Sequence, residues 1–129
     1  KMVKDLNIDV ELDICETVRE ESGLAMSSRN IYLTEDEKAE AANLYKTLNE
    51  GKRLILEDNI PDMAQVKDSM QKYLQSNAPD ISLQYIAITD REFMREIESL
   101  NNYKGEVIIS IAGFIGKARL IDNIIFNYN

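Results

Sequence analysis

The first residues of the chain alternate between apolar and charged side chains in a way that predicts a strand. Every second position of residues 8–14 is apolar and the positions between them are acidic, which is the period expected of a half-buried strand. Residues 1–6 resemble the last turns of a helix, and Asn7 is a suitable residue to end it. A helix end that leads directly into a strand is typical of the close of an α/β unit. The apolar positions of the strand are Ile8, Val10, Leu12 and Ile14.

A helix is predicted from Thr34 onward. Thr34 and Glu37 have the spacing of a capping box, in which each side chain accepts a hydrogen bond from the backbone amide of the other residue. Apolar positions three and four residues apart continue to Leu48, and the helix is expected to end near Gly51 or a few residues later. These apolar positions are Ala41, Leu44, Tyr45 and Leu48.

A second helix is predicted to begin at Pro61, because the first turn of a helix tolerates proline. The sequence Asn-Ala-Pro at residues 77–79 is expected to end it. Its apolar stripe should pack with Leu44 and Leu48 of the preceding helix against one face of a sheet. The residues of the stripe are Met63, Val66, Met70 and Tyr73.

The C-terminal third of the chain is predicted to form strands. Residues 82–89, 107–114 and 120–126 have a β-like composition, and the Ile-Gly-Lys sequence of residues 115–117 allows the last two strands to pair as a hairpin. Residues 90–97 predict a short helix or a turn. We therefore expect an α+β fold, in which two or three helices pack on a three-stranded antiparallel sheet and the helix end and strand of residues 1–20 are left over.

The composition excludes several classes of chemistry. The 129 residues include no histidine, which excludes Ser-His-Asp catalysis and histidine-ligated zinc within this chain. The single cysteine, Cys15, cannot form an internal disulfide and is expected to be a small buried residue. A net charge of −8 argues against nucleic-acid binding. The longest uncharged apolar run, residues 107–115, is too short for a membrane helix, so we expect a cytoplasmic protein without a membrane partner.

Residues 23–30 carry the most promising group of polar side chains. The stretch is irregular and contains the adjacent hydroxyls of Ser27 and Ser28, followed by the guanidinium of Arg29. Serine hydroxyls can donate hydrogen bonds to phosphate oxygens, and an arginine can bind two such oxygens at once. The composition therefore predicts either a polyphosphate-binding loop or an ordinary polar surface loop. No metal-binding residues are predicted.

Three segments, in order along the chain, resemble the pantoate–β-alanine ligase (pantothenate synthetase) family. Residues 18–33 read Val-Arg-Glu-Glu-Ser-Gly-Leu-Ala-Met-Ser-Ser-Arg-Asn-Ile-Tyr-Leu and resemble the signature of that family. The sequence Ile-Gly-Lys-Ala-Arg-Leu-Ile-Asp-Asn at residues 115–123 resembles its closing strand motif. Residues 2–7, Met-Val-Lys-Asp-Leu-Asn, are similar to the end of its nucleotide-binding domain.

The resemblance implies a function for the loop. The family joins pantoate and β-alanine with ATP and Mg²⁺ through a pantoyl adenylate, and releases AMP and pyrophosphate. Carried over by motif, Met26, Ser27, Ser28 and Arg29 would bind ATP, with Arg29 acting in catalysis, and the backbone of Val18 would meet the adenine. The other phosphate-binding motif of the family, of the His-x-Gly-His type, is absent because the chain has no histidine.

The resemblance also implies a domain organisation. Residues 1–20 would be the end of a Rossmann-like nucleotide-binding domain, and residues 21–129 the C-terminal lid domain that closes over the active site. The strand of residues 8–14 would lack its sheet, so a homodimer or a domain-swapped assembly is expected. Catalysis by the chain alone is not expected.

Two details of the motifs call for structural interpretation. Ser22 stands where the family usually has aspartate, so a local cap or ion pair at that turn is in doubt. Arg119 and Asp122 have complementary charges, but residues three apart on one strand point to opposite faces, so each is expected to bind a partner on another element. The alternative to the ligase interpretation is a stand-alone α+β interaction module that binds no nucleotide.

Overall fold

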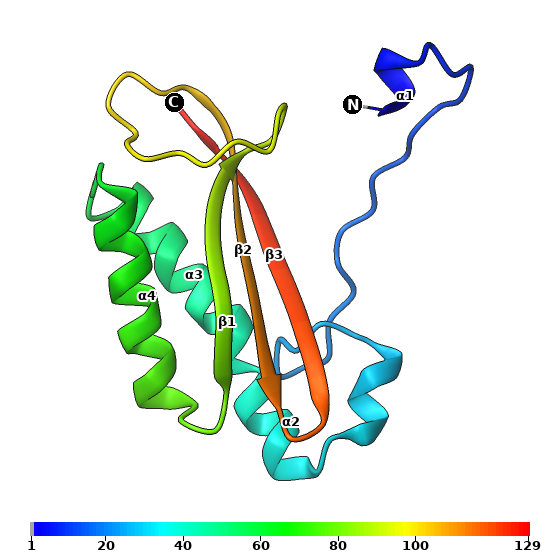
Figure 1. Cartoon of the computed structure of the whole chain (residues 1–129), viewed down its shortest axis with the longest axis vertical. Helices are drawn as coiled ribbons and strands as arrows, with labels where there is room; N and C mark the ends of the chain where they lie inside the picture. The colour runs from blue at the N-terminus through cyan, green and yellow to red at the C-terminus, as the bar shows by residue number, and fades with distance from the viewer. Residues whose placement is uncertain (1) are drawn as a thin grey trace.

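The computed structural model describes residues 2–129 and is built around a three-stranded antiparallel sheet (Figure 1). Strands β1 (Ser82–Asp90), β2 (Gly105–Ile115) and β3 (Ala118–Tyr128) lie in the order β1-β2-β3. The three predicted strands are confirmed, each slightly longer than expected. The hairpin between β2 and β3 turns at Gly116, whose positive φ of +52° is a conformation that favours glycine. Residues 91–93 form a turn, one of the two predicted possibilities.

Helices α3 (Asn43–Leu56) and α4 (Met63–Asn77) cover one face of the sheet, as Figure 1 shows, and α2 (Glu35–Ala41) precedes them. The capping box at Thr34 is present, with Thr34 Oγ1 accepting from the Glu37 amide at 3.2 Å. The single helix predicted here is instead two helices that separate at Ala42. The side-chain amide of Asn43 donates to the Glu40 carbonyl at 3.0 Å, which caps the end of α2.

Gly51 lies within α3 and does not end it. A Cβ atom added at this position would lie 2.5 Å from Met70 Sδ and 3.2 Å from Ile109 Cδ1. The glycine therefore lets α3 approach both α4 and the sheet closely. The helix continues to Leu56, within the few residues beyond Gly51 that the sequence allowed.

The start of α4 and one residue of its buried stripe differ from the prediction. The helix begins at Met63, because Asp62 accepts a hydrogen bond from the Ala64 amide at 2.9 Å and acts as the N-cap, which leaves Pro61 outside the helix. Leu74 is 1% exposed, whereas Tyr73 is only half-buried. The helix ends at Asn77, as predicted.

The core lies between the helices and the inner face of the sheet. Inward-facing residues of β2 such as Val107, Ile109 and Ile111 are fully buried. They belong to one cluster with buried residues of both long helices, as predicted for all of the named helix positions except Tyr45 and Tyr73, which are half-buried. The helical members of this cluster include Leu44, Leu48, Ile55, Met63, Val66, Met70 and Leu74. No helix among residues 2–129 is long and apolar enough to cross a membrane.

The predicted strand of residues 8–14 does not form. This segment is extended but has no strand partner among residues 2–129, and its four apolar side chains are 42–68% exposed. The helix end before it is confirmed for the described residues Met2–Asp5 (α1), whereas Lys1 lies outside them. Asn7 has φ +48°, which is the left-handed conformation common just after the end of an α-helix. The Ile8 amide donates to the Val3 carbonyl at 3.0 Å, and this hydrogen bond caps the C-terminus of α1. Cys15 is exposed, contrary to the prediction, because the segment that carries it does not pack into a core.

Candidate functional site

A short β-hairpin brings Val18 beside the Met-Ser-Ser-Arg loop. Arg19 and Ala25 form an isolated antiparallel bridge, and the Met26 amide donates to the Val18 carbonyl at 3.0 Å. The hairpin can turn because Gly23 adopts φ +91°, a conformation that few other residues tolerate. Two positions eight residues apart in the sequence are thereby fixed next to each other.

The loop residues that follow Met26 enter a short 3₁₀ helix, η1 (Ser28–Tyr32). Ser27 is its N-cap, and Ser27 Oγ accepts from the Arg29 amide at 3.2 Å. A serine hydroxyl that accepts in this way still has its own hydrogen to donate. Ser27 and Ser28 are both exposed, so both hydroxyls can reach a ligand.

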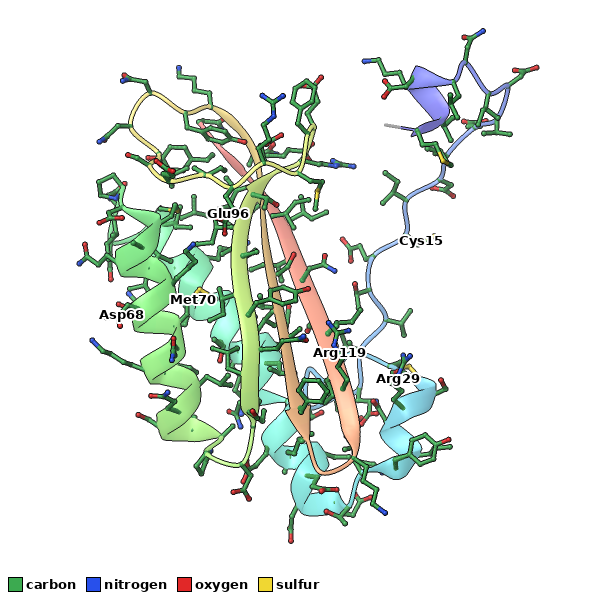
Figure 2. All side chains as sticks on the ribbon, in the orientation of Figure 1. Cys15, Arg29, Asp68, Met70, Glu96 and Arg119 are labelled. Atoms are coloured by element: carbon green, nitrogen blue, oxygen red, sulfur yellow. The ribbon has the colours of Figure 1, made fainter. Side chains whose placement is uncertain are left out.

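The guanidinium of Arg29 is available for binding. Arg29 is exposed, and among residues 2–129 its side chain has no hydrogen-bond or ion-pair partner. Figure 2 shows Arg29 on the side of η1 that lies next to β3. A guanidinium in this state carries a full positive charge and five N–H donors that can bind an anion.

Met26, Ser27 and Arg29 line one cavity of about 280 Å³ between the loop and β3. Its other wall is formed by residues 119–123 of β3. The structure therefore brings three of the five predicted ATP-binding residues together on one surface. Val18 and Ser28 lie outside the lining of this cavity, although both neighbour residues that form it.

Asn30 fixes the loop of residues 26–29 through a buried side chain. It is 6% exposed, and its Nδ2 donates to Glu20 Oε1 at 3.0 Å and to the Ala25 carbonyl at 3.1 Å. These two bonds tie η1 to both strands of the hairpin. Its Oδ1 is buried without a hydrogen-bond partner among the described residues. Asn30 was present in the recognised motif, but nothing in the spacing indicated that its side chain points inward.

A partly buried ion pair anchors the hairpin to the sheet. Arg19 donates to both carboxylate oxygens of Asp122, at 2.6 Å and 3.0 Å, and lies 3.7 Å above the ring centroid of Tyr45. The side chains of Arg19 and Asp122 are only 16% and 5% exposed. The pairing confirms that Asp122 finds its partner on another element, as the strand geometry predicted.

The serine that replaces the usual aspartate preserves the turn. Ser22 Oγ accepts a hydrogen bond from the Leu24 amide at 3.3 Å, which is the bond that a carboxylate at this position could also accept. The turn is further fixed by Tyr45, because a Cβ atom added at Gly23 would lie 2.8 Å from Tyr45 Cδ1. The local cap that the sequence put in doubt is therefore present, although a serine carries no charge with which to form an ion pair.

Arg119 is a cavity residue to which sequence reasoning gave no functional role. It lies on β3, lines the same cavity as Arg29, and donates through Nε to Gln84 Oε1 at 2.8 Å. Its presence in the closing strand motif was visible in the sequence. Its position opposite Arg29 was not, because the two residues are ninety positions apart.

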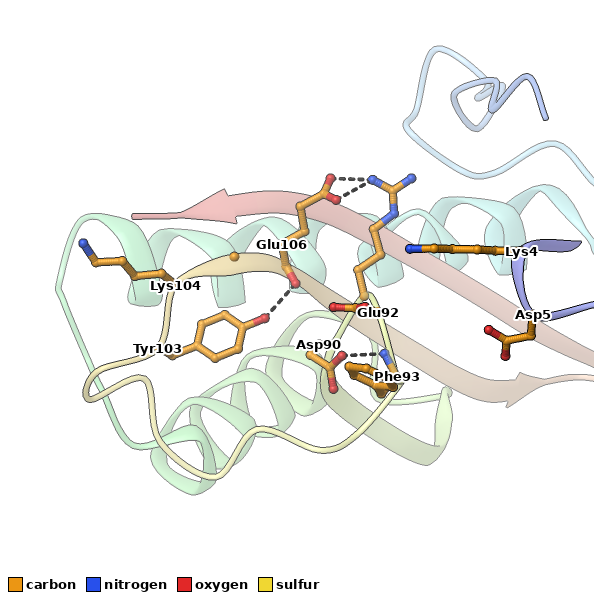
Figure 3. A pocket seen from close by; sticks show the side chains of 10 residues that line it. Lys4, Asp5, Asp90, Glu92, Phe93, Tyr103, Lys104 and Glu106 are labelled. Atoms are coloured by element: carbon orange, nitrogen blue, oxygen red, sulfur yellow. Dashed lines mark hydrogen bonds and ion pairs between the residues drawn. The ribbon is translucent and has the colours of Figure 1, made fainter. Parts of the chain in front are cut away.

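A second hollow, of about 950 Å³, lies between α1 and the loop that joins β1 to β2 (Figure 3). Several of its polar groups form hydrogen bonds or ion pairs within the turn. Arg91 pairs with Glu106, and the Tyr103 hydroxyl donates to the Glu106 carbonyl at 2.9 Å. The pKa of Asp90 is lowered, chiefly because the Phe93 amide donates to its carboxylate. These hydrogen bonds hold the loop between β1 and β2 in a fixed turn, and they do not indicate a ligand site.

Comparison with known proteins identifies relatives over nearly the whole chain. The family described as "Pantoate-beta-alanine ligase" matches residues 1–125. The pantothenate synthetase of Fervidobacterium nodosum is 47% identical over 127 residues, covering 98% of this chain and 43% of the relative. That of Thermosipho melanesiensis is 50% identical over 125 residues, covering 97% of this chain and 42% of the relative.

Solved structures agree with the sequence relatives. A crystal structure of pantothenate synthetase from Thermus thermophilus matches with a TM-score of 0.82 and 32% identity, covering 95% of this chain and 42% of that one. A pantoate–β-alanine ligase from Francisella tularensis, complexed with "Beta-gamma ATP and Beta-alanine", matches with a TM-score of 0.52 and 30% identity, covering 95% of this chain and 36% of that one. The chain spans less than half the length of these relatives. It belongs to the pantoate–β-alanine ligase family.

Proposed function

We propose that this chain is the C-terminal part of an ATP-dependent ligase that joins pantoate to β-alanine. In this proposal it supplies the loop that binds the phosphates of ATP and closes over the active site. The observation that carries the proposal is the cavity between the loop and β3, on which Met26, Ser27 and the unpaired Arg29 meet. Family membership makes a nucleotide the expected ligand.

Each loop residue has a distinct proposed role. The hydroxyls of Ser27 and Ser28 donate to phosphate oxygens, and Arg29 binds two oxygens as a fork. Arg29 is the catalytic residue of the group, because its charge stabilises negative charge that develops as ATP reacts with the pantoate carboxylate. Met26 contributes its backbone and the apolar edge of the cavity.

Val18 is proposed to contact the adenine through its backbone. Its carbonyl already accepts from the Met26 amide at 3.0 Å, but a carbonyl oxygen has a second lone pair that can accept from an adenine amino group. Because this hydrogen bond joins Val18 to the loop, the base and the phosphates would be held by one rigid unit. Val18 is 67% exposed, so the residue lies at the surface, where a ligand can reach it.

The residues of this chain do not fit a protein-held Mg²⁺ site. Among residues 2–129 no group of three or more Asp, Glu, Cys or His side chains is placed to hold a metal ion. A magnesium ion commonly reaches such enzymes on the phosphates of the nucleotide and keeps several of its waters. We therefore assign no step to a metal held by this chain.

The remaining substrates are proposed to bind mainly outside this chain. Pantoate and β-alanine would meet ATP in a cleft between this part and the rest of the enzyme, and closure would exclude water from the reactive adenylate. The exposed apolar side chains of residues 8–14 would be covered by a homodimer or domain-swapped partner. The protein would act in the cytoplasm.

A nucleotide titration of the 129-residue chain tests the proposal. We expect ATP to shift the backbone amide NMR signals of residues 26–29 and of Val18. Arg29→Ala should reduce the ATP shifts strongly and change the response to adenosine much less, because adenosine lacks the phosphates. A titration in which none of these signals moves would favour the alternative of an interaction module without nucleotide binding.

A further inference from the structure

Arg119 lies on β3, which forms the wall of the cavity opposite the loop of residues 26–29. Figure 2 shows Arg29 on η1 and Arg119 on β3 as neighbours across the space between these elements. Both residues line the cavity of about 280 Å³. Two arginines from separate elements therefore border one volume, and two guanidinium groups near one volume suit an anion with several oxygens.

Arg119 is oriented by a contact that leaves its binding end open. Its Nε donates to Gln84 Oε1 at 2.8 Å, whereas its two terminal nitrogens have no hydrogen-bond or ion-pair partner among the described residues. Gln84 lies at a register shift of β1 between Leu83 and Tyr85. A register shift of this kind changes the direction of the side chains beside it. At this one, the Gln84 side chain extends over β2 toward β3, and its Oε1 accepts from Arg119.

The charge of the cavity favours an anion. Its lining includes Arg29 and Arg119 but only one carboxylate, that of Asp122. Asp122 is neutralised by Arg19, which binds both of its oxygens. Among residues 2–129 neither cavity arginine forms an ion pair, although the whole chain carries a net charge of −8. Positive side chains that line a cavity raise the local concentration of anions there.

We propose that Arg119 is a second phosphate-binding arm that acts opposite Arg29 on the polyphosphate tail of the nucleotide. This inference rests on the proposed function and adds to it a residue of β3. Gln84 acts as a positioning residue, because its Oε1 accepts a hydrogen bond from Arg119 Nε and thereby orients the guanidinium. The arrangement places β3 in the binding site as well as in the sheet.

The inference is tested with the 129-residue chain and three ligands: ATP, inorganic pyrophosphate and AMP. The variant Arg119→Gln removes the charge and the fork. The matched control is Lys117→Gln, which makes the same change in net charge at an exposed position of the neighbouring turn, outside the cavity lining. Because Arg119 is exposed, both variants should keep the dispersed NMR spectrum of the folded chain.

Arg119→Gln should weaken the binding of ATP and pyrophosphate by about 10-fold, as for the loss of one charge-assisted contact. AMP should be affected much less, because it lacks the outer phosphates. Lys117→Gln should change none of the three by more than about 2-fold, which is the scale of a screened distant charge. Gln84→Ala should weaken pyrophosphate binding by an intermediate factor, because the charge stays but its orientation is lost.

Two results would overturn the inference. Equal effects of Arg119→Gln and Lys117→Gln would mean that only the overall charge matters. Unchanged ATP and pyrophosphate binding in Arg119→Gln, with residues 26–29 still shifting, would leave the phosphate loop intact and remove Arg119 from it. If the unmodified chain shows no shift of residues 26–29 with any ligand, the proposed function itself fails, and this inference fails with it.

Discussion

At the scale of single residues, the candidate site contains two kinds of charged side chain: buried ones that form ion pairs, and exposed ones without a partner among the described residues. Arg19 and Asp122 are of the first kind, since both are largely buried and bind each other in two places. Arg29 is of the second kind, since it is exposed without a partner among the described residues. The first pair fixes the hairpin so that the second residue can point into the cavity. This division separates residues whose loss should affect stability from those whose loss should affect binding.

Arg29→Ala is predicted to slow adenylate formation by about 10²–10³-fold in the whole enzyme, as for the loss of one preorganised donor at developing charge. Arg29→Lys should recover only part of the rate, because a point charge replaces the planar fork. Single-turnover measurement of AMP formation would provide the rates. An alanine variant with the full rate would remove the loop from the chemistry.

Arg19→Ala is predicted to lower the free energy of unfolding by about 3 kcal/mol, because it leaves the Asp122 carboxylate buried and unpaired. Urea denaturation would measure the change. The matched control is Lys72→Ala, which breaks the exposed pair between Lys72 and Asp68, whose side chains are 73% and 61% exposed. The control should change stability by less than about 0.5 kcal/mol. Similar values for the two variants would contradict the anchoring role of Arg19.

At the scale of secondary-structure elements, stability is concentrated where α3, α4 and the sheet meet. Gly51 of α3 lies so close to Met70 of α4 that a methyl group would not fit between them. Met70 is fully buried in this contact. Met70→Ala is therefore predicted to destabilise the chain by about 2–5 kcal/mol. Met26→Ala is the control, because Met26 is 62% exposed, and a loss below about 0.5 kcal/mol for Met70→Ala would contradict the packing.

The turn after β1 should make stability depend on pH. The Asp90 carboxylate accepts from the amides of Phe93 and Arg95, at 2.6 Å and 2.8 Å, and its pKa is lowered chiefly by the first of these bonds. A folded pKa below the unfolded value of about 4 means that the stabilisation is complete above that value and is lost as pH falls through the folded pKa.

Asp90→Asn is the variant that isolates this effect. The difference in stability between the variant and the original chain should be constant near neutral pH and shrink as pH falls below about 4. Denaturation curves recorded over that range would measure it. A difference that grows as the solution becomes more acidic would have the wrong sign and would contradict the assignment.

Locally determined elements could be predicted from the sequence, whereas those that depend on distant partners could not. The Thr34 capping box and the turn at Gly116 involve neighbouring residues, and both formed as expected. The strand of residues 8–14 needs a neighbouring strand for its hydrogen bonds, so its alternation alone could not produce it. The loop at Ser27 was found by resemblance, but Arg119 could be placed beside it only once β3 was folded against the loop.

At the scale of the whole molecule, the chain consists of a packed domain and an extended N-terminal segment. Figure 1 shows this segment leading from the hairpin of residues 18–26 toward α1, away from the helices that cover the sheet. The domain has its own core of helices and sheet, so it has the means to fold as a unit. The proposed phosphate loop, residues 26–29, lies where the domain and the segment join. Motion of the domain would therefore carry the loop with it.

The last prediction concerns catalysis by the 129-residue chain. It spans 43% of the length of the F. nodosum relative, and of the two phosphate-binding motifs that the family resemblance implies, only the proposed one at residues 26–29 has a counterpart in its sequence. Holding reactants together can contribute about 7–11 kcal/mol to lowering a barrier, and one half of a cleft cannot provide that contribution. We therefore expect no measurable pantothenate formation by this chain, and ATP binding no tighter than about millimolar.

Mixing experiments test this expectation directly. A separately expressed N-terminal portion of the enzyme, added to the chain with ATP, pantoate and β-alanine, should restore pantothenate formation to a degree that depends on the concentration of both parts. Arg29→Ala in the chain should abolish most of the restored activity, which controls for activity of the N-terminal portion by itself. Turnover by the chain alone would show that its own residues complete the active site, because catalysis then would not depend on a second part that holds the substrates against the loop.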